Sequence, residues 1–133
     1  MIYGLDTSVL VRLLVGEPAE FAAKAKARLL LAHRLRQVIV ASDLVIAEAW
    51  YALKHHYEFE PAEVRVALLA MLTSGLVQPE PGSAVLSVLQ SNAGGKAGLV
   101  DRLIQARYQA DGLTTLSLDR AQAKLGRARF IGK

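Results

Sequence analysis

Four acidic residues occupy positions from which their carboxylates could act together. Asp6 and Asp119 each follow a short apolar segment, Glu48 is the only charge between residues 44 and 53, and Asp101 falls in the first turn of an expected helix. Carboxylates that lie together repel one another unless a pKa rises or a hard cation binds. Oxygen ligands of this kind suit Mg²⁺ or Mn²⁺. The pattern therefore indicates a divalent-metal site.

Each of these acids also has a simpler structural explanation. Asp6, Thr7 and Ser8 are all good residues for capping the start of a helix, and Asp119 could cap a short helix in the same way. Asp101 would interact favourably with the positive end of a helix dipole. For Asp6, Asp101 and Asp119, a structural role at a helix start and a role in metal binding both stay open at this stage.

Glu48 lies in an expected helix over residues 44–57 that has apolar residues on two faces. Such a helix is predicted to be buried on both faces. A buried carboxylate costs several kcal/mol unless it is paired or bound to a cation. No basic residue stands three or four positions away in the sequence. A long-range ion pair with Arg12 or Arg102 is the alternative to a bound cation.

The elements that must position these acids alternate along the chain. We expect strands at 2–5, 38–41, 76–79, 113–118 and, at the end, 129–131, with helices at 8–15, 20–35, 44–57, 61–74, 83–90, 99–110 and 120–125. The first strand is expected to be buried, and the third is expected at an edge of the sheet because its proline cannot join a central ladder. This alternation predicts an α/β fold, a three-layer α/β/α sandwich with a parallel sheet of four to five strands. The ends of the first and fourth strands would meet if they flank a switch point of the sheet.

The overall composition suits one compact domain spanning residues 1–133. The chain is 53% hydrophobic and 21% charged, and it contains no cysteine, which excludes disulfides and thiolate chemistry. No uncharged run approaches the ~20 apolar residues of a membrane span, and the start lacks a basic signal-peptide region. We therefore expect a cytoplasmic protein that does not enter the membrane.

Basic residues are concentrated in two stretches that contain no acid. The formal net charge is +4, and residues 24–36 and 120–133 together hold ten of the sixteen lysines and arginines. Clustering of this kind favours a polyanion such as nucleic acid as partner. A solvated helix face would give the same pattern, so the two interpretations have equal weight here.

Residues 92–98 are expected to form a flexible loop. A Gly-Lys pair is present there, but Gln90 stands where a phosphate-binding P-loop requires glycine, and Ala97 stands where it requires serine or threonine. The segment is therefore not interpreted as a P-loop.

The four acidic motifs together resemble those of the PIN-domain ribonucleases, in particular the VapC-type toxins of bacterial and archaeal toxin–antitoxin pairs. The resemblance rests on the segments LDTSVL at 5–10, VIAEAW at 45–50, VDRLI at 100–104 and LSLDR at 116–120. Each segment is weak alone, but four in the right order over the whole chain make a specific signal. The resemblance implies metal-dependent hydrolysis of RNA phosphodiester bonds, a homodimer and an antitoxin protein as partner.

The resemblance also implies roles for individual residues. Asp6, Glu48, Asp101 and Asp119 would be the catalytic residues and hold Mg²⁺ or Mn²⁺, with Asp6 and Asp101 as the first choices for direct ligands. A metal of this kind activates water and stabilises charge on phosphoryl oxygens. Hydroxyl groups would hydrogen-bond the ligand carboxylates and hold them in place. These hydroxyls belong to Thr7, Ser8 and Ser117.

One departure from the family pattern favours a different function. Members often carry a further acid three residues before the Asp101 position, where this chain has Gly98. The alternative is therefore a catalytically impaired PIN-like module that binds RNA or a protein. A receiver-like phosphoacceptor domain fits less well, because the acid after the first strand stands alone. A haloacid-dehalogenase phosphatase would need an aspartate at the position of Ser8.

Aromatic and histidine residues near Glu48 receive no functional role from the sequence. His55 and His56 are interpreted as surface residues at a helix end. Trp50, Tyr51 and Tyr57 are interpreted as core or dimer contacts rather than as base-stacking residues.

Overall fold

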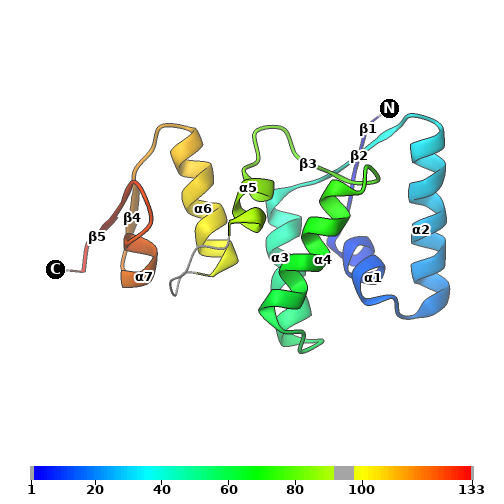
Figure 1. Cartoon of the computed structure of the whole chain (residues 1–133), viewed down its shortest axis with the longest axis horizontal. Helices are drawn as coiled ribbons and strands as arrows, with labels where there is room; N and C mark the ends of the chain where they lie inside the picture. The colour runs from blue at the N-terminus through cyan, green and yellow to red at the C-terminus, as the bar shows by residue number, and fades with distance from the viewer. Residues whose placement is uncertain (1, 92–97, 133) are drawn as a thin grey trace. The chain divides into compact units, whose positions relative to one another are not determined.

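The computed structural model describes residues 2–91 and 98–132, which form two compact units, Met1–Pro81 and Gly82–Lys133 (Figure 1). Each unit has its own strands, helices and apolar core. We call them unit 1 and unit 2 and describe each by itself.

The sheet of unit 1 has three parallel strands, β1 (Ile2–Gly4), β2 (Val38–Ala41) and β3 (Gln78–Pro79). Their spatial order is β1-β2-β3, so β2 is central. Tyr3 lies opposite Ile39, and Val40 lies opposite Gln78. The expected edge position of the third strand is confirmed, as its proline requires.

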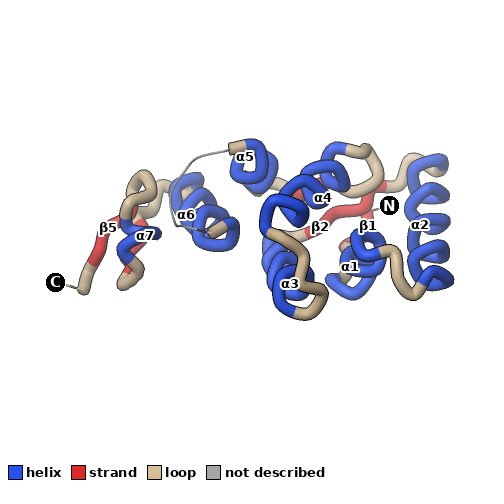
Figure 2. The backbone as a smooth tube through the Cα atoms, turned by 60° about the horizontal axis from the view of Figure 1, so that its bottom comes forward, coloured by secondary structure: helices blue, strands red, loops and turns tan. Residues whose placement is uncertain are grey.

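Four helices surround this sheet: α1 (Thr7–Val15), α2 (Ala19–Arg34), α3 (Asp43–His55) and α4 (Pro61–Thr73). Helix α1 packs against α2 and α3, and α3 packs against α4. Figure 2 shows β1 and β2 passing between α1 and α4. The apolar core lies between these layers, and its side chains that are at most 1% exposed include Leu10, Ile46, Leu53 and Leu68.

Unit 2 contains α5 (Val85–Gln90), α6 (Leu99–Ala110), β4 (Thr115–Ser117), α7 (Arg120–Ala123) and β5 (Ala128–Phe130). Strands β4 and β5 pair in parallel, with Leu116 opposite Arg129. Helix α6 packs against both α5 and α7. The buried side chains of this unit include Val85, Leu89 and Leu103.

The observed elements follow the expected alternation, and every strand pair described is parallel. The five strands are described as a three-stranded and a two-stranded sheet, one in each unit. Strands β1 and β4 belong to different units, so the meeting of their ends stays a prediction, as does a single domain over 1–133. The expected loop at 92–98 lies outside the described residues except for Gly98.

Two expectations about burial were wrong. The first strand is not buried, because β1 is an edge strand and Ile2 is 73% exposed. The second apolar face of α3 does not meet the core either, since Leu44 is 77% exposed and Tyr51 is 50% exposed. Only the face of α3 that carries Ile46 and Trp50 is buried.

Within residues 2–91 and 98–132, no helix is both long enough and apolar enough to cross a membrane.

Candidate functional site

The first acidic motif lies where β1 ends and α1 begins. The backbone N–H of Leu5 donates to the carbonyl of Val40 at 2.8 Å, which is the last sheet contact before the chain turns into the helix. Asp6 then caps α1: its Oδ2 accepts from the backbone N–H of Ser8 at 3.2 Å and from the Ser8 hydroxyl at 2.6 Å. The capping role considered for Asp6 is therefore confirmed.

Capping by Asp6 is compatible with binding a cation. The side chain is exposed, and a carboxylate has about four lone-pair positions on its two oxygens, of which the two Ser8 bonds use only part. The Ser8 hydroxyl, and then its backbone N–H, lower the pKa of Asp6 below the ordinary value of 3.8. The carboxylate is therefore ionised at neutral pH and reachable from solvent.

Glu48 stands in the second turn of α3, which begins directly after β2. Ser42 caps this helix by accepting the backbone N–H of Val45 on its hydroxyl at 3.2 Å. Because β1 and β2 are parallel neighbours, the starts of α1 and α3 follow the same edge of the sheet. The sheet thus positions Asp6 and Glu48 within unit 1.

The predicted burial of Glu48 was wrong, because its side chain is exposed on the outer face of α3. Burial therefore does not force this carboxylate to take a cation. In the part of the chain that the structure describes, Glu48 also has no ion pair. The guanidinium of Arg12 instead donates to the Tyr57 hydroxyl at 2.9 Å.

A hollow of about 380 Å³ brings Thr7 and Glu48 together. The rings of Tyr51 and His55 stack beside it, with centroids 5.9 Å apart and an angle of 15° between their planes. We call this feature the α3 hollow. Its lining residues are Thr7, Glu48, Tyr51, Ala52, His55 and His56.

The other two acids lie in unit 2. Asp101 is half-buried in the first turn of α6. Asp119 follows β4 and caps α7, where its Oδ1 accepts from the backbone N–H groups of Ala121 at 2.8 Å and Gln122 at 3.3 Å. Unit 2 therefore repeats the arrangement of unit 1, in which an aspartate follows a strand and caps the next helix.

A hydrogen-bonded network around Gln122 links the segments that carry Asp101 and Asp119. The side-chain amide of Gln122 donates from Nε2 to the backbone carbonyl of Asp101 at 3.4 Å. The buried hydroxyl of Ser117 accepts the backbone N–H of Asp119 at 2.9 Å and lies 3.4 Å from Oε1 of Gln122. Gln122 could not be found from the sequence, because a lone glutamine in a short helix gives no signal.

The four acids are thus divided between the units, with Asp6 and Glu48 in one and Asp101 and Asp119 in the other. Across residues 2–91 and 98–132, no group of three histidine, aspartate or glutamate side chains could hold a metal ion. Each pair offers only oxygen donors, which are the donors that Mg²⁺ and Mn²⁺ prefer. A site formed by all four carboxylates stays a prediction.

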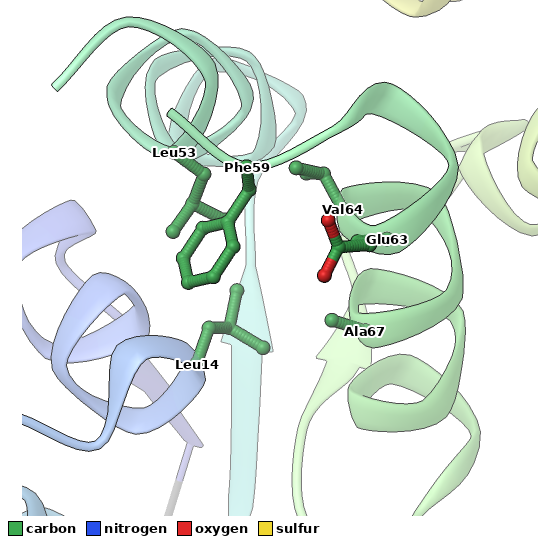
Figure 3. Close-up of a pocket in the computed structure, with 6 residues that line it drawn as sticks. All are labelled: Leu14, Leu53, Phe59, Glu63, Val64 and Ala67. Carbon is green, nitrogen blue, oxygen red and sulfur yellow. The ribbon is translucent and has the colours of Figure 1, made fainter. Parts of the chain in front are cut away.

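A separate cavity of about 150 Å³ lies between α1, α3 and α4. Leu14, Leu53 and Phe59 lie on one side of it, and Glu63, Val64 and Ala67 of α4 lie on the other (Figure 3). Glu63 supplies the one carboxylate of this lining, and its Oε1 already accepts the backbone N–H of Glu60 at 3.2 Å. The cavity is apolar and contains none of the four motif acids.

The basic side chains of the two stretches are exposed wherever the structure describes them. Three of them lie over aromatic rings: Lys24 is 5.9 Å from the ring centroid of Phe21, Arg28 is 5.0 Å from that of Tyr3, and Arg120 is 4.3 Å from that of Phe130. Exposed cations held in this way remain able to meet a polyanion.

The chain matches the model of a known protein family. The family model of the PIN domain matches residues 3–128, a range that includes all four motif acids. No curated protein matches the chain. Because the matched range covers nearly all of the sequence, the chain belongs to the PIN-domain family.

Proposed function

We propose that this chain is a metal-dependent ribonuclease that hydrolyses phosphodiester bonds in RNA, and that it is the toxin of a toxin–antitoxin pair. PIN domains are generally nucleases and typically use divalent metal ions. The observation that carries the proposal is that the family match spans Asp6, Glu48, Asp101 and Asp119. The motifs of VapC-type toxins around these acids support the toxin assignment.

The proposed metal ligands are the four carboxylates, with Mg²⁺ or Mn²⁺ as the cation. The donor set fits such an ion, because it contains only oxygen and because Asp6 is exposed with a lowered pKa. When bound, the cation would stabilise negative charge on the phosphoryl oxygens and acidify water.

The chain's own residues would position the substrate and the carboxylates. Ser8 fixes the Asp6 carboxylate through its hydroxyl, and Ser117 with Gln122 fixes the segments of Asp119 and Asp101. Thr7 would orient the substrate or a ligand from the wall of the α3 hollow. The exposed cations of α2 and of residues 120–129 would hold the RNA backbone.

Gly98 supports a second candidate, a PIN-like module that binds RNA without cutting it. Gly98 precedes α6 with φ −75°, which any residue can adopt, and among the described residues no atom lies within 4 Å of a Cβ placed there. The backbone and the local packing thus leave room for an acid. The missing carboxylate would weaken one metal position.

Cleavage of a mixed-sequence single-stranded RNA distinguishes the two functions. The purified, partner-free protein is assayed with Mg²⁺, with Mn²⁺ and with EDTA. Cleavage that requires a metal supports the nuclease. Binding of the RNA without cleavage under either metal selects the binding module.

A homodimer and an antitoxin protein are the further partners that we infer, both from the toxin motifs. Light scattering of the purified chain tests the dimer. Co-purification with the product of a neighbouring gene, together with suppression of RNA cleavage by that product, tests the antitoxin.

A further inference from the structure

We propose that the α3 hollow is a subsite for one unpaired nucleobase of the RNA, which stacks on the ring pair of Tyr51 and His55. The inference rests on the proposed function, because it extends the path of the substrate beyond the carboxylates. It gives a role to His55, which had none, and it departs from the sequence-based interpretation of Tyr51 as a core or dimer contact.

The position of the hollow relates it to the proposed reaction centre. Thr7 directly follows Asp6, and Glu48 is one of the proposed ligands, and both side chains line the hollow. A phosphate held at the carboxylates of unit 1 therefore has a neighbouring nucleotide within reach of the same hollow. The volume of about 380 Å³ leaves room for a flat base.

The aromatic pair has the geometry that base stacking needs. Tyr51 and His55 stand one helical turn apart on α3, both are exposed, and their ring planes differ by only 15°. Unpaired bases of single-stranded RNA are commonly recognised by stacking on such rings. A base that enters the hollow would extend a stack that already exists in the protein.

The mixed chemistry of the lining favours a nucleotide over a protein surface. Glu48, Thr7 and His56 surround the rings with polar groups. A protein partner that covered the hollow would remove the unpaired Glu48 carboxylate from water, which is unfavourable. A single base covers the rings and leaves polar groups around it hydrated.

The test measures RNA binding in EDTA, so that its result does not depend on cleavage. The wild-type chain and the Tyr51→Ala variant are titrated with a labelled single-stranded RNA and with versions that carry one abasic nucleotide at successive positions. We expect Tyr51→Ala to raise the Kd about tenfold, as for loss of one stacked base. One abasic position should raise it by a similar factor.

Combining Tyr51→Ala with the abasic RNA isolates the contact between the ring and the base. On the RNA that lacks the critical base, Tyr51→Ala should have little further effect, because the partner of the ring is already absent. Tyr51→Phe keeps the ring and should bind nearly as the wild type does, while His55→Ala should weaken binding as Tyr51→Ala does. The matched control is Tyr108→Ala, which removes a tyrosine that is 44% exposed and lies outside the hollow.

Three results would overturn the inference. The first is an unchanged Kd for Tyr51→Ala, and the second is an equal loss of binding for intact and abasic RNA. The third is a change of oligomeric state with RNA binding retained, which would make Tyr51 a contact between copies of the chain. If removal of one base weakens binding as expected but the wild-type protein cuts no RNA, the result supports the base subsite and contradicts the proposed nuclease activity.

Discussion

The Ser8 hydroxyl donates a 2.6 Å hydrogen bond to Oδ2 of Asp6, the same oxygen that accepts the backbone N–H of Ser8. Ser8 thus restricts the orientations that the Asp6 side chain can adopt at the end of β1. The bond also favours the ionised form of the carboxyl group, which is the form that binds a cation. The contact between Ser8 and Asp6 therefore supports both the capping of α1 and the proposed metal binding.

Replacing Ser8 with alanine should raise the pKa of Asp6 toward its ordinary value of 3.8, because the largest stabilising hydrogen bond to the carboxylate is lost. The measurement is an NMR titration of the Asp6 carboxyl carbon in metal-free protein. An unchanged pKa would contradict the role given to the Ser8 hydroxyl.

The lowered pKa of Asp6 also determines how the effect of Ser8→Ala on stability changes with pH. The folded-state pKa of Asp6 is lowered, so its contribution is present above the unfolded-state pKa and is lost as the pH falls through the folded-state pKa. The difference in stability between wild type and Ser8→Ala should therefore narrow when the pH falls into that acidic range. Denaturation of both proteins at a series of pH values measures this difference in stability.

Gln122→Ala should lower both stability and cleavage, because the side-chain amide of Gln122 donates to the carbonyl of Asp101 and accepts from the Ser117 hydroxyl, which in turn accepts the backbone N–H of Asp119. Loss of a hydrogen bond of this kind lowers the free energy of unfolding by about 1 kcal/mol. If Gln122 positions the proposed ligands, cleavage should fall about tenfold, with the metal affinity reduced as well. Gln90→Ala, which removes an exposed glutamine of the same unit, is the control and should change neither quantity.

Gly98→Asp should strengthen metal binding, because it adds a carboxylate three residues before Asp101 at a position where a side chain fits. Gly98→Asn is the matched control, since asparagine caps α6 about as well as aspartate but carries no charge. Calorimetric titration with Mn²⁺ should give a lower Kd for Gly98→Asp than for Gly98→Asn. Equal values would show that Gly98 does not stand at a metal position.

Removing the charges of Lys24, Lys26 and Arg28 should reduce the salt dependence of RNA binding. Each lost contact with a single-stranded phosphate backbone lowers the slope of log K against log[salt] by about 0.7, so three contacts give a change of about 2. Anisotropy titrations at several salt concentrations measure the slope. Arg107→Gln is the control, because this guanidinium lies 4.0 Å from Asp111 within α6 and its cap. A slope that matches the wild type would remove α2 from the RNA path.

Much of the fold could be predicted from local signals. Asp6, Ser42 and Asp119 cap the helices that follow them, and Pro61 opens α4, so strand ends and helix starts could be read to within one or two residues. Parallel pairing followed from the alternation of strands and helices. Boundaries were less accurate in β4, where the apolar run at 113–118 is longer than the strand at Thr115–Ser117.

The candidate site could be predicted only in part, for a physical reason. Periodicity shows that α3 has two apolar faces, but it does not show which face meets the core, so Glu48 was placed inside although it is exposed. The network of Gln122 depends on a contact between α7 and α6 that spacing does not show. Tyr51 and His55 are four residues apart on one helix, but the stacking of their rings depends on side-chain rotamers. Asp6, Asp101 and Asp119 were found because strand ends and helix starts have clear signals, whereas Glu48 was found as the only charge between residues 44 and 53.

The most direct test of the proposed ribonuclease is cleavage of single-stranded RNA by the wild type and by Asp6→Asn, each with Mg²⁺, Mn²⁺ and EDTA. Asparagine keeps the capping of α1 but removes the charge, so the fold should be retained. Asp111→Asn removes an exposed aspartate elsewhere and serves as control. We predict metal-dependent cleavage that Asp111→Asn retains and that Asp6→Asn loses by more than about 100-fold, beyond the effect of a group that only orients a ligand. Equal cleavage by Asp6→Asn and the wild type would contradict the account.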